Sequence, residues 1–287
     1  MKGNYNHTFI KTNGIRLHVV LAGPEAGRLV ILLHGFPEFW YAWRSQIPPL
    51  AEAGYRVVVP DQRGYNLSEK PERVAAYSLD TLAQDIIGLI QALGRKKAYI
   101  VGHDWGAAVA WQLATYHSEW VEKLAILNVP HPAVMSRALR RDRRQLRKSW
   151  YMFYFQIPWL PERMLAMNNF QALADTLQRT SRPGTFTDED LVHYKGAWAQ
   201  PGAITAMINW YRNVVQSGMR YLVKPMALPS ISVPTLVLWG KKDFALEWRL
   251  AEESLGLCKA GRLVFFENAT HWVQHEEAEG VNQLLLE

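Results

Sequence analysis

Residues 98–107 read Ala-Tyr-Ile-Val-Gly-His-Asp-Trp-Gly-Ala, and this stretch predicts a buried strand that turns sharply into a helix. The short apolar run Ala98–Val101 is typical of a strand inside a sheet, and the helix is expected to continue to Tyr116. Gly102 and Gly106 flank Asp104, and small residues there let strand and helix pass closely. The turn is therefore expected to raise the Asp104 side chain at the C-terminal edge of a sheet.

On either side of this turn, strands alternate with helices. Short runs rich in branched residues predict buried strands, and the helical spacing of apolar residues predicts a helix over Leu79–Leu93. The expected strands are Leu29–Leu33, Arg56–Pro60, Ala98–Val101, Leu124–Asn128, Thr235–Trp239 and Leu263–Phe266. Strand and helix in regular order imply a mostly parallel sheet flanked by helices, which is an α/β fold.

From Pro132 to about Pro229 the strand pattern stops, and the sequence is typical of helices. Helix starts are expected at Pro161-Glu162 and at Thr187, which can cap the acidic turn that follows it. We therefore predict an α/β core made of residues 1–131 and 230–287, interrupted by an all-helical lid over residues 132–229.

The composition excludes several classes of protein. The chain has 287 residues, 49% of them apolar, with nine histidines and a single cysteine, Cys258. Disordered and collagen-like chains, disulfide frameworks and cysteine-based metal sites are excluded on this basis. The first residues lack the apolar stretch of a signal peptide, and no run approaches membrane-spanning length. The sequence thus predicts a cytoplasmic protein with no membrane partner.

The formal charge of +6 is concentrated in one segment. Residues 137–148 hold seven basic residues and one acid, Asp142, whereas the rest of the chain is neutral. These charges fall on several sides of a helix, so we interpret the segment as a solvated face beside the start of the lid rather than an anion-binding surface. No nucleic-acid partner is expected.

Two more residues follow strands in the order that the Asp104 turn requires. Asp243 comes just after Thr235–Trp239, and His271 comes after Leu263–Phe266. Singly, Asp104 could be a helix cap, Asp243 a turn acid and His271 the first residue of a helix. Nucleophile, acid and histidine in this chain order are typical of α/β-hydrolases, so together they predict a catalytic triad. Phe36, after the strand Leu29–Leu33, offers a backbone N–H to an oxyanion.

His271 and His275 lie four residues apart beside Glu276, a spacing that also occurs in zinc sites. The chain lacks H-E-x-x-H, and a third ligand cannot be named. No metal site is therefore predicted.

Seven motifs together resemble those of the α/β-hydrolase-fold epoxide hydrolases, over essentially the whole chain. They are His34-Gly35-Phe36-Pro37, Asp61-Gln62-Arg63-Gly64-Tyr65, Gly102-His103-Asp104-Trp105-Gly106, Tyr154-Phe155-Gln156, Asn209-Trp210-Tyr211-Arg212, Asp243-Phe244 and His271-Trp272. One departure is Asn66, where many members carry glycine. Because asparagine tolerates a positive φ, the turn is expected to survive.

The resemblance implies that the chain converts a hydrophobic epoxide and water into a vicinal diol, without a metal or an organic cofactor. It implies that Asp104 attacks the epoxide and forms an ester. His271, oriented by Asp243, then activates water against that ester. The backbone N–H groups of Phe36 and Trp105 are implied as the oxyanion hole.

The resemblance also implies that two lid tyrosines donate hydrogen bonds to the epoxide oxygen. They are the tyrosines of Y-F-Q and of N-W-Y-R, which fall here on Tyr154 and Tyr211, whereas Tyr151 and Tyr194 receive no such role. Spacing alone would make Tyr154 part of the apolar face of a lid helix. The expected substrate contacts are Phe36, Pro37, Trp105, Tyr154 and Tyr211, and Phe36-Pro37 matches a bond that is usually cis in the family.

Two other functions stay open on the sequence alone. A haloalkane dehalogenase would use Asp104, His271 and the indole N–H of Trp105 but would have no task for paired tyrosines. A catalytically silent binding protein on the same fold would form no covalent bond at Asp104. A role in detoxification fits an epoxide hydrolase, and the natural epoxide and the oligomeric state are left open.

Overall fold

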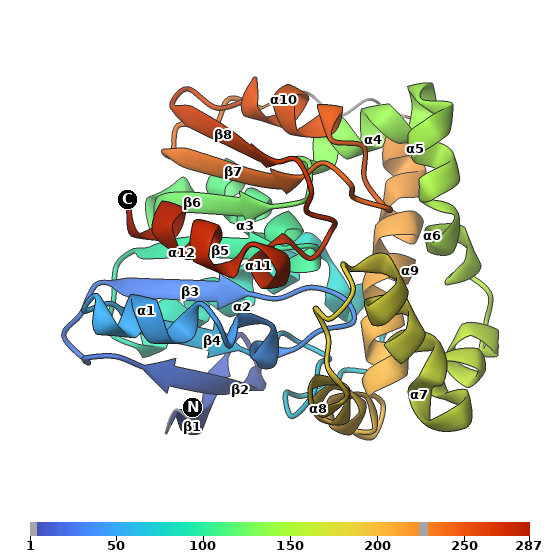
Figure 1. The fold of residues 1–287 in the computed structure, drawn as a ribbon, viewed down its shortest axis with the longest axis horizontal. Helices are drawn as coiled ribbons and strands as arrows, with labels where there is room; N and C mark the ends of the chain where they lie inside the picture. Colours follow the sequence, from blue (N-terminus) through green and yellow to red (C-terminus); the bar gives the residue numbers. More distant parts are fainter. Residues whose placement is uncertain (1–4, 224–228) are drawn as a thin grey trace.

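An eight-stranded sheet in the order β1-β2-β4-β3-β5-β6-β7-β8 forms the centre of the molecule. The structure is a computed structural model that describes residues 5–223 and 229–287 (Figure 1). The strands are β1 (Asn6–Thr12), β2 (Ile15–Ala22), β3 (Leu29–Leu33), β4 (Arg56–Pro60), β5 (Ala98–His103), β6 (Val121–Leu127), β7 (Thr235–Gly240) and β8 (Gly261–Phe266).

The six strands from β4 to β8 in this order pair in parallel, and β2 joins β4 in an antiparallel manner. The predicted fold class, a mostly parallel sheet flanked by helices, is confirmed. The antiparallel hairpin of β1 and β2 was not among the predicted strands. Much of β1 is exposed at the edge of the sheet, so its sequence lacks the continuous apolar run of a buried strand.

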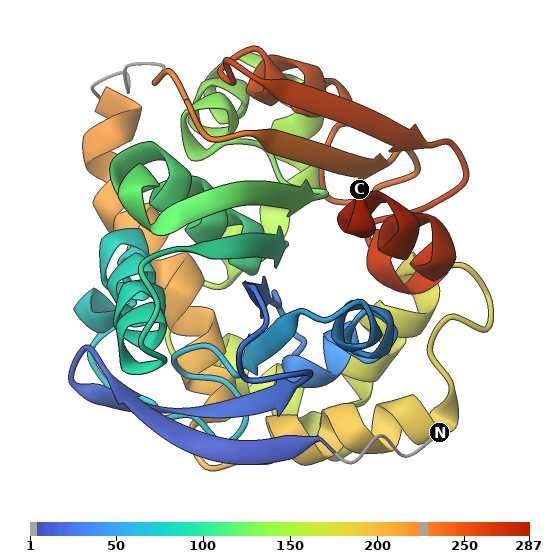
Figure 2. The ribbon, with the colours of Figure 1, turned by 90° about the vertical axis from the view of Figure 1, so that its left-hand side faces the viewer.

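Each central strand supplies alternate side chains to two apolar cores, one on each face of the sheet. In β3, Leu29, Ile31 and Leu33 belong to one core, and Val30 and Leu32 belong to the other. The first core is covered by α2 (Leu79–Ala92), α3 (Trp105–Tyr116) and α10 (Arg249–Leu255), and the second by α1 (Ile47–Glu52), α11 (Val273–Glu276) and α12 (Ala278–Leu286), as Figure 2 shows. Three short 3-10 helices complete the core: η1 (Trp40–Trp43), η2 (Val74–Tyr77) and η3 (Ser118–Trp120).

A group of helices lies across the edge of the sheet where the parallel strands end (Figure 1). They are α4 (Pro132–Arg141), α5 (Arg143–Lys148), α6 (Trp150–Tyr154), α7 (Leu160–Thr180), α8 (Asp188–Trp198) and α9 (Ala203–Val223). Thr187 caps α8 in a capping box with Asp190, and α7 starts next to the predicted Pro161-Glu162. The domain limits 1–131, 132–229 and 230–287 stay a prediction, and residues 224–228 lie outside the described residues.

Three aromatic side chains of these helices hydrogen-bond to loops of the core. Trp198 Nε1 donates to the Pro37 carbonyl at 2.6 Å, and Trp210 Nε1 donates to the Arg63 carbonyl at 3.0 Å. Tyr194 Oη donates to Glu38 Oε1 at 2.6 Å. These bonds satisfy buried donors that would otherwise be costly, and they tie the lid to the loops after β3 and β4. None of the helices in residues 5–223 and 229–287 is long and apolar enough to cross a membrane.

The backbones at the turn between β5 and α3 approach each other closely. A Cβ added to Gly106 would lie 2.1 Å from the Leu33 carbonyl oxygen, and one added to Gly102 would lie 2.4 Å from the Gly106 carbonyl oxygen. Only glycine fits at either position, because the neighbouring atoms are backbone atoms that cannot move aside. The sequence stretch 98–107 thus brings the start of α3 against the end of β3.

We expect Gly106→Ala to lower the free energy of unfolding by at least about 2 kcal/mol, because the new methyl group collides with the backbone of β3. Gly196→Ala is the matched control: Gly196 lies within α8 with nothing within 4 Å of an added Cβ. Alanine there should raise the stability by about 1 kcal/mol through helix propensity. Urea unfolding of both variants checks this, and equal effects would contradict the close approach.

Candidate active site

Asp104 lies at the turn between β5 and α3 in a strained backbone conformation. Its φ of 49° and ψ of −124° lie in a region where residues other than glycine are rare. Although it precedes α3, its side chain makes no capping hydrogen bond, so the alternative of a simple helix cap is not supported. A Cβ added to Gly35 would lie 2.2 Å from the Asp104 Cβ, so the loop after β3 leaves room for this side chain.

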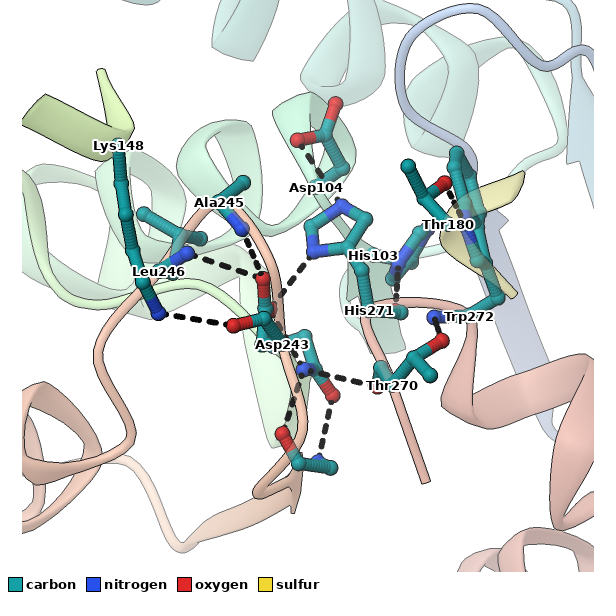
Figure 3. Close-up of polar contacts among 12 residues, drawn as sticks. His103, Asp104, Lys148, Thr180, Asp243, Ala245, Leu246, Thr270, His271 and Trp272 are labelled. Carbon is teal, nitrogen blue, oxygen red and sulfur yellow. Dashed lines mark hydrogen bonds and ion pairs between the residues drawn. The ribbon is translucent and has the colours of Figure 1, made fainter. Parts of the chain in front are cut away.

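The three predicted triad residues meet at the C-terminal edge of the sheet (Figure 3). His271 Nε2 lies 3.5 Å from Asp104 Oδ2, and His271 Nδ1 lies 2.8 Å from Asp243 Oδ2. His271 and Asp243 are buried, whereas the Asp104 carboxylate is 17% exposed. The imidazole therefore bridges two carboxylates, one of them accessible.

The buried carboxylate of Asp243 accepts hydrogen bonds from four donors. Its Oδ1 accepts from the backbone N–H groups of Ala245 and Leu246 at 2.7 and 2.9 Å, and its Oδ2 accepts from Asn128 Nδ2 at 2.8 Å and from His271. Asn128 directly follows β6 and was missed in the sequence analysis, where it was assigned only to a strand. Its place after a parallel strand was the signal, since such strands end at one edge of the sheet.

One predicted oxyanion donor already contacts the nucleophile. The backbone N–H of Phe36 donates to Asp104 Oδ1 at 2.8 Å, and the Phe36-Pro37 peptide bond is cis. Trp105, the other predicted donor, is the first residue of α3. Pro37 is buried, and its carbonyl is the acceptor for Trp198. The expected positive φ of Asn66 is also present, at 40°.

Tyr211 lies in the site, among the rings of the residues around Asp104. It is 5% exposed, and its ring centroid lies 5.4 Å from that of Phe36 and 4.9 Å from that of Trp105. Its nearest lid partners are Phe155 and Tyr151, with ring centroids 4.8 and 5.8 Å away.

The second tyrosine near Asp104 is Tyr151, not Tyr154. Tyr154 is half-buried, packs beside Trp150 with ring centroids 6.0 Å apart, and the charge that acts on its hydroxyl is that of Glu162. The charges that act on Tyr151 are those of Asp104 and Asp243. The structure therefore does not bring Tyr154 to Asp104, and Tyr151 lies where Tyr154 was expected.

The reason for this correction is the phase of the helix. Tyr151 and Phe155 are four residues apart, so they share a face of α6 with the buried Met152 beside it. Trp150 and Phe153 are exposed, and Tyr154 leans toward their side. The i, i+4 pair of Tyr151 and Phe155 was the sequence signal that could have found the inward tyrosine.

The protonation states of the site follow from its charges. Burial raises the pKa of Asp104, but the neighbouring His271 outweighs burial and lowers it below the ordinary value, and the same holds for Asp243. Burial lowers the pKa of His271, but the two carboxylates outweigh it and raise the pKa to about 10. Burial and then the charge of Asp104 raise the pKa of Tyr151 and of Tyr211. At neutral pH both phenols therefore carry a proton and Asp104 is ionised.

Nothing in the described ranges, 5–223 and 229–287, groups three or more histidine, cysteine or acidic side chains as a metal site would. His275 points away from His271: its Nε2 lies 2.7 Å from Glu38 Oε1. Behind the triad, His103 Nε2 donates to the His271 carbonyl at 2.8 Å. His103 therefore helps to hold the backbone at His271, and His275 is paired with Glu38.

The raised pKa of His271 predicts a pH dependence of stability. A group whose pKa is higher in the folded chain stabilises it fully below the ordinary value of 6.5, and this contribution is lost as the pH rises toward about 10. The free energy of unfolding of the wild type, relative to His271→Gln, should therefore fall over this range, by at most about 1.4 kcal/mol per pH unit. NMR titration of the His271 ring measures the same pKa directly, and an ordinary pKa there would contradict the ion-pair assignment.

Comparison with known proteins agrees with this geometry. A family model described as alpha/beta hydrolase fold matches residues 28–278. The AB hydrolase superfamily protein YfhM of Bacillus subtilis is 49% identical over 280 residues, which cover 97% of this chain and 96% of that protein. Human Epoxide hydrolase 4 is 39% identical over 289 residues, which cover 99% of this chain and 78% of that protein.

The same holds among solved structures. A crystal structure of Bacillus megaterium epoxide hydrolase in complex with an inhibitor is 30% identical, with a TM-score of 0.88 and coverage of 97% of this chain and 98% of that one. On its sequence, its sheet and these similarities, the chain belongs to the α/β-hydrolase fold and, within it, to the epoxide hydrolase family.

Proposed function

We propose that the chain hydrolyses apolar epoxides to vicinal diols through a covalent ester on Asp104. The observation that carries this proposal is the pair of phenols, Tyr151 and Tyr211, beside a carboxylate that is itself paired with His271. Epoxide opening needs a nucleophile on one side of the ring and a proton donor on the other. Membership of the epoxide hydrolase family supports the same reaction.

In the first step, Asp104 attacks an epoxide carbon and the C–O bond breaks toward the lid. The low pKa of Asp104 keeps it ionised, and the raised pKa values of Tyr151 and Tyr211 keep both phenols protonated. The phenols donate to the leaving oxygen, and one of them supplies its proton. The rings of Phe36, Trp105 and Phe155 around Tyr211 favour an apolar substrate.

In the second step, water hydrolyses the ester. Once Asp104 is esterified, its negative charge no longer raises the pKa of His271, whereas the pair of Nδ1 with Asp243 remains. His271 therefore gives up its Nε2 proton, and the phenolate left by the first step regains one. The neutral Nε2 then accepts a proton from the water that attacks the carbonyl carbon of the Asp104 ester. We assign the oxyanion to the N–H of Phe36, 2.8 Å from Asp104 Oδ1, and to the N–H of Trp105, each worth about 3 kcal/mol. The acyl C–O bond breaks, and the leaving diol oxygen takes the proton from His271. The new carboxylic acid of Asp104 then returns its proton to His271, which restores the resting ion pair.

His271→Gln should open the epoxide but fail to hydrolyse the ester. After incubation with an apolar epoxide such as styrene oxide, mass spectrometry should find the intact substrate mass added at Asp104. Asp104→Asn is the matched control and should show no adduct at early times.

Parallel assays of diol and halide with the wild type separate the alternatives. Diol from epoxides without halide from haloalkanes supports the proposal. Halide release without diol would support a dehalogenase, and neither product, with no adduct, would support a silent binding protein.

Tyr151→Phe and Tyr211→Phe should each slow ring opening, by about 10²-fold or more, because each removes a proton donor to the leaving oxygen. Tyr154→Phe is the matched control, since it removes the same hydroxyl three residues away, and it should keep about wild-type activity. Stopped-flow measurement of ester formation isolates this step from hydrolysis. A large loss in Tyr154→Phe with none in Tyr151→Phe would restore the assignment made from the Y-F-Q motif.

A further inference from the structure

A ridge of large apolar side chains is exposed on the lid. Leu146 lies in α5, Trp150 and Phe153 lie in α6, and Ile157 follows α6 in the segment before α7; all four are exposed. Trp150 is 64% exposed, Phe153 52% and the nearby Trp159 68%. In Figure 1 these helices lie on the side of the lid farther from the sheet than α9. We call these five residues the apolar ridge.

Exposed arginines adjoin the apolar ridge. Arg141, Arg143, Arg144 and Arg147 are all exposed, and none of the four forms an ion pair with another residue in the described part of the chain. Two other cations of segment 137–148 do form ion pairs: Arg137 pairs with Glu253, and Lys148 pairs with Glu247. Most of the positive charge of segment 137–148 that no ion pair balances therefore lies on exposed arginines next to the apolar ridge.

The inner side of the same helices is already packed. Gln145, Ser149 and Met152 are buried, and Gln145 Nε2 donates to the Ala245 carbonyl at 2.9 Å. Gln145 Oε1 also accepts from the backbone N–H of Glu247 at 2.9 Å. The apolar ridge is thus the outer side of a segment that the core already holds, and it is free to meet a partner.

The chemistry of the apolar ridge and its arginines selects among partners. Indole and phenyl rings are suited to the boundary between headgroups and acyl chains, and arginines beside them attract anionic headgroups. A symmetric contact with a second copy would bring a second set of four arginines to the same interface, where their like charges repel. A nucleic acid would use the arginines and stack on rings, but it would leave Leu146 and Ile157 without a partner.

We propose that the apolar ridge and the adjoining arginines form a docking surface for an anionic lipid bilayer. The sequence alone indicated a solvated helical face there, because it did not show that the apolar side chains beside the charges point outward. Docking itself does not depend on the reaction. Its use rests on the proposed function: Tyr151 belongs to the same short helix as Trp150 and Phe153, so docking holds the site next to the phase in which an apolar epoxide dissolves.

Sedimentation with vesicles tests the proposal on the full chain. We expect binding to vesicles of phosphatidylcholine mixed with phosphatidylglycerol, little binding to phosphatidylcholine alone, and a decrease in binding at high salt. Arg143→Gln, Arg144→Gln and Arg147→Gln should each weaken binding by about fivefold. Trp150→Ser with Phe153→Ser should weaken it by at least about tenfold.

Matched substitutions elsewhere on the surface are the controls. Tyr116→Ser removes another exposed ring, and Lys96→Gln with Lys97→Gln removes other exposed cations; neither should change vesicle binding. Thermal melting should be unchanged in every variant, because all the altered side chains are exposed or half-exposed.

Absence of binding to the anionic vesicles would overturn the proposal. Vesicle binding that is unchanged by the Trp150 and Phe153 substitutions and equalled by binding to duplex DNA would also overturn it. A concentration-dependent dimer that those two substitutions abolish would do so as well. Diol formation in detergent-free buffer is measured separately, so a failure to dock is distinguishable from a failure of the proposed reaction.

Discussion

The close approach of α3 to the end of β3 is the constraint on which the active site depends. Gly102 and Gly106 let the two backbones pass at distances that no Cβ would allow, and Gly35 leaves the space that the Asp104 side chain occupies. The cost is local: Asp104 adopts a positive φ that is unfavourable for a residue with a Cβ. The result is a carboxylate that reaches the N–H of Phe36 from a different strand loop. The proposed nucleophile and the proposed oxyanion donor are thus brought together by backbone packing.

The second determinant of the site is its charge. A single imidazole lies between two carboxylates, so the protonated His271 balances the charge of one of them and leaves a net charge of one negative unit. Burying Asp243 is costly unless its oxygens are hydrogen-bonded, and Ala245, Leu246 and Asn128 meet that need. Asp104 keeps an exposed edge instead. The buried acid is therefore held in place by its donors, whereas the accessible one is left for chemistry.

Much of this could be predicted from the sequence because of where parallel strands end. Strands such as Leu29–Leu33 and Arg56–Pro60 were placed to the residue, since runs of branched apolar side chains have few other uses. Asp104, Asp243 and His271 each follow such a strand, and their meeting follows from the sheet. The hairpin of β1 and β2 lacked that pattern. Tyr154 was chosen because a motif records which residues occur and not which side of a short helix they face.

Contacts between the lid and the core could not be predicted, since they join residues far apart in the chain through side chains with no local pattern. Trp210 Nε1 donates to the Arg63 carbonyl, and Tyr211, the next residue of α9, lies beside Asp104. Trp198 Nε1 donates in the same way to the carbonyl of Pro37, the residue that follows Phe36. Each of these hydrogen bonds thus lies one residue away from a group to which we assign a role in the reaction, namely Tyr211 or the N–H of Phe36. A displacement of α8 or α9 would have to break a buried hydrogen bond before it moved a phenol or an oxyanion donor. The positions of Tyr211 and Phe36 relative to each other therefore depend on these two indole hydrogen bonds as well as on the elements that carry the two residues.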